Sequence, residues 1–210
     1  MTDLTVYRAG FLTSLSSGTG IQYLSEEELN NLTAVWQSYY YEAGKKAKKP
    51  NRGRYFLTYL FLRFSGARLS EVLSIDDEKD IDWRNNEVKI RTYKTRRKNA
   101  GRIVPLPPAV LQELARYLME YPEMRGKVFK IDPRNFRRIF HNLAVKAGIP
   151  EEKAHPHILR HSRAMEMIKA GIPLTIIQNI LGHASLNSTA VYLRFSNVEA
   201  KMLMREKGLI

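Results

Sequence analysis

The segment RYFLTYLFLRFSGARLSEVLSI, residues 54–75, constrains the fold of this chain more than any other stretch. Apolar side chains occupy nearly every position of its first half, whereas a surface helix carries a single apolar stripe. A helix of this kind is expected at the centre of a hydrophobic core, with other elements packed on all sides. Ser65 and Gly66 interrupt the apolar pattern, which restarts near Leu69. The sequence therefore predicts a buried central helix, a break, and a second helical start.

Helical and strand-like patterns follow one another along the rest of the chain. Before the central helix, Ser25 and Glu28 form a capping box ahead of an apolar repeat at helical spacing. After it, DIDWRNNEVKIRTYKT and GRIVPLP alternate with period two, which predicts an antiparallel sheet of two or three strands with a turn at Asn85 and Asn86. Further helices are predicted at residues 108–121, 133–147, 156–170, 174–181 and 188–205. This order predicts an α+β fold that is mainly helical, with a small antiparallel sheet.

The charge of the chain indicates a polyanionic partner. Its 210 residues include 34 Lys+Arg against 21 Asp+Glu, a formal net charge of +13 at pH 7. The cations cluster in KKAKKPNRGR, which we interpret as a basic connector at residues 45–54, and in KTRRKNAGR at residues 94–102. A charge run alone is usually a solvated face, but this clustering favours nucleic acid over an anionic membrane. The residues expected to contact the nucleic acid are Lys45, Lys46, Lys48, Lys49, Arg52, Arg96, Arg97 and Lys98.

Three features that the sequence lacks limit where in the cell we expect the chain to act. It contains no cysteine, which excludes disulfides and cysteine chemistry. The N-terminal MTDLTVYRAGFLTSL has an acid among its first residues and no sustained apolar core, unlike a signal peptide. No apolar run approaches the length that crosses a bilayer. We therefore expect a cytoplasmic protein that contacts no membrane.

The stretch AHPHILRHSRAMEM, residues 154–167, crowds histidines and arginines together. His157 and His161 lie four residues apart and would share one face of a helix, as zinc ligands often do. Arg160 lies between them, and a permanent cation disfavours a divalent metal. No cysteine or nearby carboxylate completes a ligand set, while the same cations suit a phosphate. The stretch therefore predicts a phosphate site and no metal site.

Five short motifs carry more information together than each does alone. They are GARLSEVL around Arg68, the basic hairpin YKTRRKNAGRIVPL with Lys94, HILRH with His157 and Arg160, LGH ending at His183, and TAVYLRFS with Tyr192. In this combination, from about Leu24 to Phe195, the chain resembles the tyrosine recombinases, the phage-integrase-like family of site-specific DNA recombinases. The resemblance implies a helical catalytic domain with a small antiparallel sheet, acting on double-stranded DNA.

The resemblance also assigns a role to each motif arginine. Arg68 and Arg160 would clamp the phosphate, because a guanidinium stays charged and offers a planar fork that matches phosphate oxygens. Two such cations can stabilise the transition state without a metal, and no cofactor is expected. A plainer alternative is that Arg68 caps its helix or pairs with Glu71.

The remaining roles implied by the resemblance concern proton transfer. Tyr192 would be the nucleophile, and since a phenol has a pKa of about 10 it needs a base, for which His157 is the candidate. His183 would hydrogen-bond a phosphate oxygen, and Lys94 would protonate the leaving 5′ oxygen. The same hairpin also carries Arg96, Arg97 and Lys98. Lysine is preferred as the acid because arginine does not release a proton at usable pH.

Three functions compete for this set of residues. The first is a site-specific recombinase or integrase that cuts and rejoins DNA through a 3′-phosphotyrosyl bond. The second is a type IB topoisomerase-like relaxing activity. The third is a non-catalytic DNA-binding regulator, which would have no need to keep Tyr192 beside two arginines and two histidines.

The organisation of the chain completes these expectations. Residues 1–22 are expected to form an extended or flexible lead-in, and residues 23–196 the catalytic domain. Residues 197–210 would form a C-terminal tail that neighbouring subunits could exchange. Family members usually carry a separate N-terminal helical domain, and this chain resembles the catalytic domain alone. We expect a monomer when the protein is free and a homo-oligomer, a tetramer, on DNA.

Overall fold

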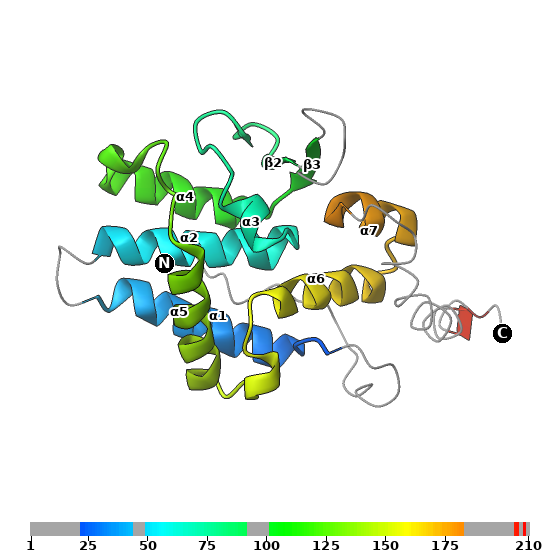
Figure 1. Cartoon of the computed structure of the whole chain (residues 1–210). Helices are drawn as coiled ribbons and strands as arrows, with labels where there is room; N and C mark the ends of the chain where they lie inside the picture. Colours follow the sequence, from blue (N-terminus) through cyan, green and yellow to red (C-terminus); the bar gives the residue numbers. More distant parts are fainter. Residues whose placement is uncertain (1–21, 44–48, 92–100, 183–203, 206–207, 209–210) are drawn as a thin grey trace.

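The computed structural model describes residues 22–43, 49–91, 101–182, 204–205 and 208. Its strands are β1 (Ile81–Asp82), β2 (Glu87–Arg91) and β3 (Gly101–Pro105). Its helices are α1 (Glu26–Tyr41), α2 (Lys49–Ser65), α3 (Leu69–Val72), α4 (Pro108–Glu120), α5 (Pro133–Lys146), α6 (His157–Lys169) and α7 (Leu174–Leu181), with short 3-10 turns η2 (Pro122–Met124) and η3 (Glu151–Lys153). Figure 1 shows the helices packed around α2, with the small sheet at one side. The prediction of a mainly helical α+β fold with a small antiparallel sheet is confirmed.

Helix α2 lies at the centre of the core, as its apolar sequence predicts. Every residue from 56 to 65 is buried, and α1, α4 and α6 all contact the helix. Its one buried cation, Arg63, pairs with Glu166 of α6. Gly66 follows the helix in the left-handed region at φ 64°, which a residue without Cβ adopts at little cost. The predicted break between α2 and α3 is therefore confirmed.

The predicted basic connector at residues 45–54 is wrong in its second half, because α2 already begins at Lys49. Pro50 is the second residue of this helix, where its missing N–H would have no partner in the helix. Gly53 is buried against α4, and a Cβ built there would lie 2.4 Å from Cε2 of Tyr117. The glycine thus lets a tyrosine ring approach the helix backbone, a packing role that charge patterning does not reveal.

Helix α1 begins at the predicted capping box and is fixed to α2 by aromatic packing. The Glu28 N–H donates to Ser25 Oγ at 3.1 Å, and the Ser25 N–H donates to Glu28 Oε2 at 2.6 Å. The Trp36 ring stacks on Tyr59 of α2 with ring centroids 5.0 Å apart. Burial of large aromatic rings dominates core energetics, so this stack firmly couples the two helices.

The sheet is antiparallel, with strand order β1-β2-β3. Asn86, at φ 55°, lies in the turn between β1 and β2, where a turn at Asn85 and Asn86 was predicted. In the register of β2 with β3, Val88 lies opposite Val104 and Arg91 lies opposite Gly101. Residues 92–100, which join these two strands, lie outside the described residues. The sheet therefore defines where the basic hairpin leaves and rejoins the fold.

The C-terminal helices match their predicted ranges to within a residue or two at each end. Helices α6 and α7 share a small apolar cluster, formed by Ala164, Met165, Met167, Ile168, Ile177 and Leu181. The predicted helix at residues 188–205 falls almost wholly outside the described residues. Among the helices that the structure describes, none is long and apolar enough to cross a membrane.

Candidate active site

Arg160 is held deep in the fold by the turn that follows α2. It lies in the first turns of α6 and is only 3% exposed. Its Nη1 donates to the carbonyl oxygen of Gly66 at 2.8 Å. Because Gly66 takes up the left-handed conformation, the chain reverses there and its carbonyl faces α6. The break predicted from sequence thus positions one of the two expected phosphate-binding arginines.

Arg68 lies two residues beyond that turn, as the N-cap of α3. Its Nη1 donates to Glu71 Oε1 at 3.1 Å, and its backbone N–H donates to Glu71 Oε2 at 2.9 Å. The pairing with Glu71, raised as an alternative to a phosphate contact, is therefore present. It does not exclude that contact, because the Arg68 side chain is 33% exposed and a guanidinium has five N–H donors.

Glu71 is buried beneath these cations, and it also accepts bonds from the sheet. Arg102 of β3 donates to both carboxylate oxygens, with Nη2 2.8 Å from Oε2 and Nη1 3.4 Å from Oε1. Burial alone would raise the pKa of Glu71, but the hydrogen bonds and charges of Arg102 and Arg68 hold the pKa below its usual value. Glu71 is therefore an anion that pairs with two arginines, one from α3 and one from β3.

Arg102 is a site-adjacent residue that our reading of the sequence passed over. It lies within the basic run at residues 94–102, where one more cation carries little information. The alternation of side chains along a strand could have revealed it, because residues two apart lie on the same face and Val104, two residues later, is buried. A cation on the buried face of a strand needs an anionic partner, and Glu71 supplies it.

His157 and His161 pack against each other on α6. Their rings meet edge to face, with centroids 4.8 Å apart and planes at 87°. Burial, helped by the charges of Arg160 and Arg68, lowers the pKa of His157 below its ordinary value of 6.5. Burial and the neighbouring His157 and Arg160 lower the pKa of His161 to about 4. Both rings are consequently neutral at pH 7, and His157 can accept a proton.

These contacts bring three of the six expected catalytic residues into one region. Arg68 and Arg160 both depend on the turn at Gly66, and their charges act on His157. Figure 1 shows α3, β3, α6 and α7 meeting at the end of α2 that leads into this turn. Within the described residues, no group of three or more histidines, cysteines or carboxylates is arranged to hold a metal ion.

The other three expected catalytic residues, Lys94, His183 and Tyr192, lie outside the described residues. Their neighbours in sequence are described. Strand β2 ends at Arg91, before Lys94 in the sequence, and strand β3 begins at Gly101, after it. Helix α7 ends at Leu181, and Gly182 caps it in the left-handed conformation directly before His183. The expected DNA contacts Lys45, Lys46, Lys48, Arg96, Arg97 and Lys98 also lie outside the described residues.

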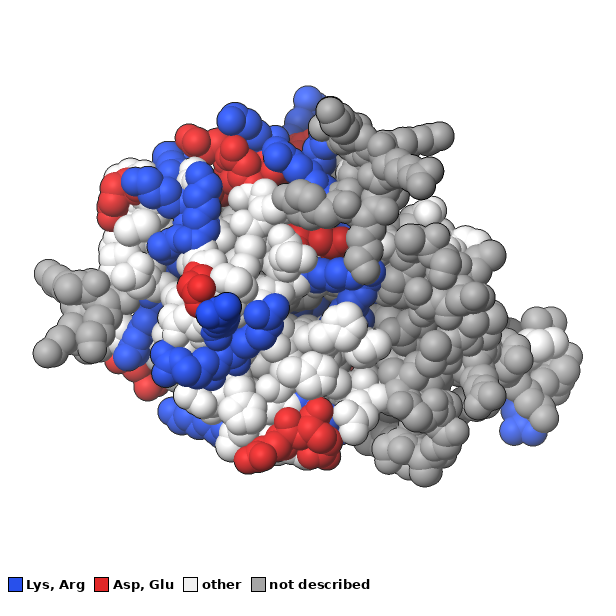
Figure 2. Space-filling view, viewed as in Figure 1, with Lys and Arg blue, Asp and Glu red and all other residues white. Residues whose placement is uncertain are grey.

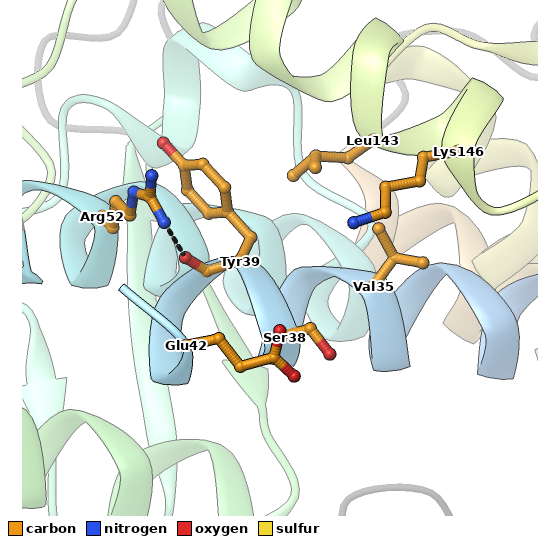
Figure 3. A pocket seen from close by; sticks show the side chains of 7 residues that line it. All are labelled: Val35, Ser38, Tyr39, Glu42, Arg52, Leu143 and Lys146. Atoms are coloured by element: carbon orange, nitrogen blue, oxygen red, sulfur yellow. Dashed lines mark hydrogen bonds between the residues drawn. The ribbon is translucent and has the colours of Figure 1, made fainter. Parts of the chain in front are cut away.

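The two expected DNA contacts that are described both have partners within the protein. Lys49 Nζ lies 3.1 Å from Glu120 Oε1. Arg52 donates from Nη1 to the Tyr39 carbonyl at 3.0 Å and lies 4.7 Å from the centroid of the Tyr39 ring. Figure 3 shows Arg52 and Tyr39 at the edge of a cavity of about 250 Å³ between α1 and α5. A DNA contact by either cation stays a prediction.

A basic face on α5 is a further candidate contact that our reading of the sequence missed. Arg134, Arg137 and Arg138 are exposed, while Phe136 and Phe140 are buried on the opposite side of the helix. Figure 2 shows Lys and Arg side chains gathered over α5 on this face of the molecule. The spacing of these arginines could have predicted the face, because residues three and four apart lie on one side of a helix. Arg134, Arg137 and Arg138 do not form a consecutive run of charge, so only the helical spacing reveals them.

Comparison with known proteins identifies the class to which this fold and site belong. Residues 22–198 match the model of the phage integrase family. The chain therefore belongs to this family, and its resemblance to the tyrosine recombinases is confirmed.

Individual relatives agree with that assignment. The tyrosine recombinase XerA of Pyrococcus furiosus is 32% identical over 163 residues, which cover 73% of this chain and 54% of that protein. A tyrosine recombinase of Pseudothermotoga lettingae is 32% identical over 151 residues, 70% of this chain and 51% of that protein. The chain thus spans about half the length of these relatives. A crystal structure of XerA recombinase superimposes with a TM-score of 0.69 at 25% identity, covering 89% of this chain and 65% of that one.

The chain also matches nearly the whole length of a solved catalytic domain. The catalytic domain of bacteriophage HP1 integrase superimposes with a TM-score of 0.60 at 19% identity, covering 87% of this chain and 93% of that one. At this identity the likeness concerns the fold alone. The predicted fold of a tyrosine recombinase catalytic domain is confirmed.

Proposed function

We propose that this chain cleaves and rejoins DNA strands in site-specific recombination, through a 3′-phosphotyrosyl bond to Tyr192. The observation that carries the proposal is the convergence of Arg68, Arg160 and the neutral His157 at the turn after α2. Two fixed guanidiniums suit the non-bridging oxygens of one phosphodiester. They stand in place before the reaction, so they stabilise the developing negative charge without reorganising.

The reaction follows from the chemistry of these groups. The Tyr192 oxygen attacks phosphorus while its proton passes to neutral His157, which requires a histidine pKa below the working pH. The bond from phosphorus to the 5′ oxygen breaks, and Lys94 supplies the proton that the leaving oxygen takes. Attack by a 5′ hydroxyl on the phosphotyrosyl bond then reverses these steps and reseals the strand. The phosphotyrosyl ester conserves the bond energy, so the cycle consumes no nucleotide.

Double-stranded DNA is the proposed partner. The net charge of +13 and the exposed cations of α5 suit a polyanion. A structural neighbour with a TM-score of 0.66 is XerH site-specific recombinase bound to its palindromic difH substrate. Another, with a TM-score of 0.63, is the Tn1549 transposon integrase in complex with circular intermediate DNA. These neighbours support the proposal for DNA, and a cytoplasmic site of action is proposed with it.

The decisive test is formation of a covalent adduct on a nicked duplex of candidate host sequence, resolved on a denaturing gel. Wild-type protein is expected to form the adduct, and Tyr192→Phe is expected to bind DNA without forming it, since only the attacking oxygen is removed. Tyr121→Phe is the matched control and should form the adduct normally, because that hydroxyl donates to Glu120 Oε1 in an exposed hydrogen bond. An undiminished adduct with Tyr192→Phe would assign the nucleophile elsewhere.

The same preparation separates the competing functions. Exchange of strands between two duplexes supports recombination. Relaxation of a supercoiled plasmid without any joining of two sites would favour the topoisomerase-like activity. Tight binding with no adduct in wild-type protein would favour the non-catalytic regulator.

We further propose that the protein is a monomer in dilute solution and assembles as a tetramer on DNA, where neighbouring sites raise the effective concentration. Light scattering with and without a two-site duplex tests this, using the full chain and a chain that ends at Phe195. A stable tetramer without DNA would contradict the proposal. Normal assembly by the shortened chain would show that the tail at residues 197–210 does not join the subunits.

A further inference from the structure

Arg102 joins three elements that bear on the candidate active site. It lies on β3, and its side chain is only 10% exposed. Its two terminal nitrogens bond the carboxylate of Glu71 on α3, at 2.8 and 3.4 Å. Its Nε donates to the carbonyl oxygen of Ile180, in the last turn of α7, at 2.6 Å. One guanidinium therefore bridges the sheet to two helices.

The first of these contacts leads to Arg68. Glu71 accepts both the Arg68 backbone N–H and its side chain, so the direction of the carboxylate decides where the Arg68 guanidinium lies. Arg102 holds that carboxylate from the other side through a bidentate pair, which fixes orientation as well as distance. Rotation of Glu71 away from Arg102 would carry Arg68 with it.

The second contact leads to the end of α7. The bonded carbonyl of Ile180 is one of the last in that helix, whose cap is Gly182 at φ 69°. A Cβ built on Gly182 would lie 2.5 Å from Arg102 Nη1, so the glycine backbone packs directly against the guanidinium. His183 is the next residue in the sequence. Arg102 therefore fixes the point from which the chain continues to His183.

The chemistry of the contacts requires arginine in particular. The planar guanidinium directs Nε to the Ile180 carbonyl of α7 and both Nη atoms to the Glu71 carboxylate of α3. A lysine has a single nitrogen and could not bond both groups in this way. Buried ion pairs of this kind often add little net stability, because desolvating the charges costs about as much as their attraction returns. The contribution of this buried pair is therefore geometric, since it fixes the positions of Glu71 and the end of α7.

We propose that Arg102 is a positioning residue for DNA cleavage, which sets Arg68 through Glu71 and sets the C-terminal end of α7 before His183. The inference rests on the proposed function, since its main readout is cleavage. Arg102 acts through these neighbours and need not touch the reacting atoms.

The first test measures single-turnover cleavage of a nicked duplex at saturating protein, together with the Kd for the same duplex. Arg102→Gln is expected to lower the cleavage rate about 10²-fold, the usual effect of a misplacement of about 1 Å, while Kd stays within about threefold of wild type. Arg102→Lys should recover part of the rate, because it can reach Glu71 but not the Ile180 carbonyl as well.

Arg116→Gln is the matched control, since Arg116 also pairs with a buried carboxylate, Glu113, but within α4. It should cleave at the wild-type rate. Equal losses in Arg116→Gln and Arg102→Gln would show a general effect of breaking a buried ion pair. A cleavage rate in Arg102→Gln within twofold of wild type would also overturn the proposal.

A second readout does not depend on activity. Hydrogen exchange at the end of α7, where the Gly182 N–H donates to Gln178 at 2.9 Å, should be about tenfold faster in Arg102→Gln and unchanged in Arg116→Gln. If wild-type protein forms no adduct, the proposed function fails while this measurement still tests the link to α7. Unchanged exchange in Arg102→Gln would show that α7 is held without Arg102, which overturns the inference.

Discussion

Replacement of Gly66 by alanine should destabilise the protein by two separable effects. The left-handed conformation at φ 64° costs a residue with a side chain about 1–2 kcal/mol. The added Cβ would also lie 2.6 Å from Leu181 Cδ2 and 3.3 Å from Arg163 Cγ. Leu181 is fully buried, so its methyl cannot turn aside without displacing neighbours. Overpacking of this kind adds about 1–3 kcal/mol, for a total of about 2–5 kcal/mol.

Gly171→Ala provides the matched comparison. Gly171 has a similar backbone, φ 74°, but a Cβ there would meet nothing within 4 Å. Urea unfolding followed by circular dichroism should therefore give a loss of only about 1–2 kcal/mol for this variant. In a Leu181→Ala background most of the extra cost of Gly66→Ala should disappear, leaving the backbone cost and the milder contact with Arg163 Cγ at 3.3 Å.

Gly66→Ala should also lower DNA cleavage by more than its loss of folded protein explains. The Gly66 carbonyl oxygen accepts from Arg160 Nη1 at 2.8 Å, so a shift of this turn would move a cation that we propose to bind the phosphate. Adduct formation should fall at temperatures where the variant is still folded, whereas Gly171→Ala should react normally. Equal losses of unfolding free energy in the two glycine variants would refute the packing argument, and normal cleavage by Gly66→Ala would refute the link to Arg160.

Three further predictions concern the candidate active site. Burial lowers the pKa of His161 from 6.5 to about 4 in the folded protein, so as pH falls the unfolded state binds a proton before the folded state does. The free energy of unfolding should therefore drop between pH 6.5 and 4. Urea titrations of His161→Gln should show a smaller drop over this range. Arg68→Ala and Arg160→Ala should each slow adduct formation by ~10²–10³-fold, and EDTA should not; activity lost with EDTA and restored by zinc would revive a metal site. A 5′-bridging sulfur substrate should rescue Lys94→Ala, because a thiolate leaves unprotonated, and rescue of Arg96→Ala instead would move the acid to another residue.

Much of the fold could be predicted because local signals and burial agree. Nearly every position in the apolar run of α2 predicts burial, and the capping box at Ser25 involves only residues three apart in the sequence. The start of α2 at Lys49 was missed because a basic run resembles a loop, whereas in the fold Gly53 lets the ring of Tyr117 on α4 pack against this first part of the helix. Such a contact joins residues far apart in the sequence and has no local signature.

The candidate site divides in the same way. Arg68, His157 and Arg160 could be proposed because motif spacing singles them out, and the structure places them in one region. Arg102 was missed because its importance comes from a tertiary contact with Glu71, and the arginines of α5 because their pattern is helical and not consecutive. The sequence supplied a set of candidate reacting groups, and it lacked the neighbours that hold the described ones in place.

The central position of α2 bears on how the protein is synthesised. Helix α2 contacts α1 and α4, but a further part of its surface is covered only by α6, which emerges from the ribosome about a hundred residues after α2. Until then part of a highly apolar helix has no cover, a state that attracts chaperones and favours aggregation. Arg160 arrives on that same late helix. The nascent chain therefore cannot bring Arg68 and Arg160, its two candidate phosphate-binding arginines, together before α6 is made and the core closes.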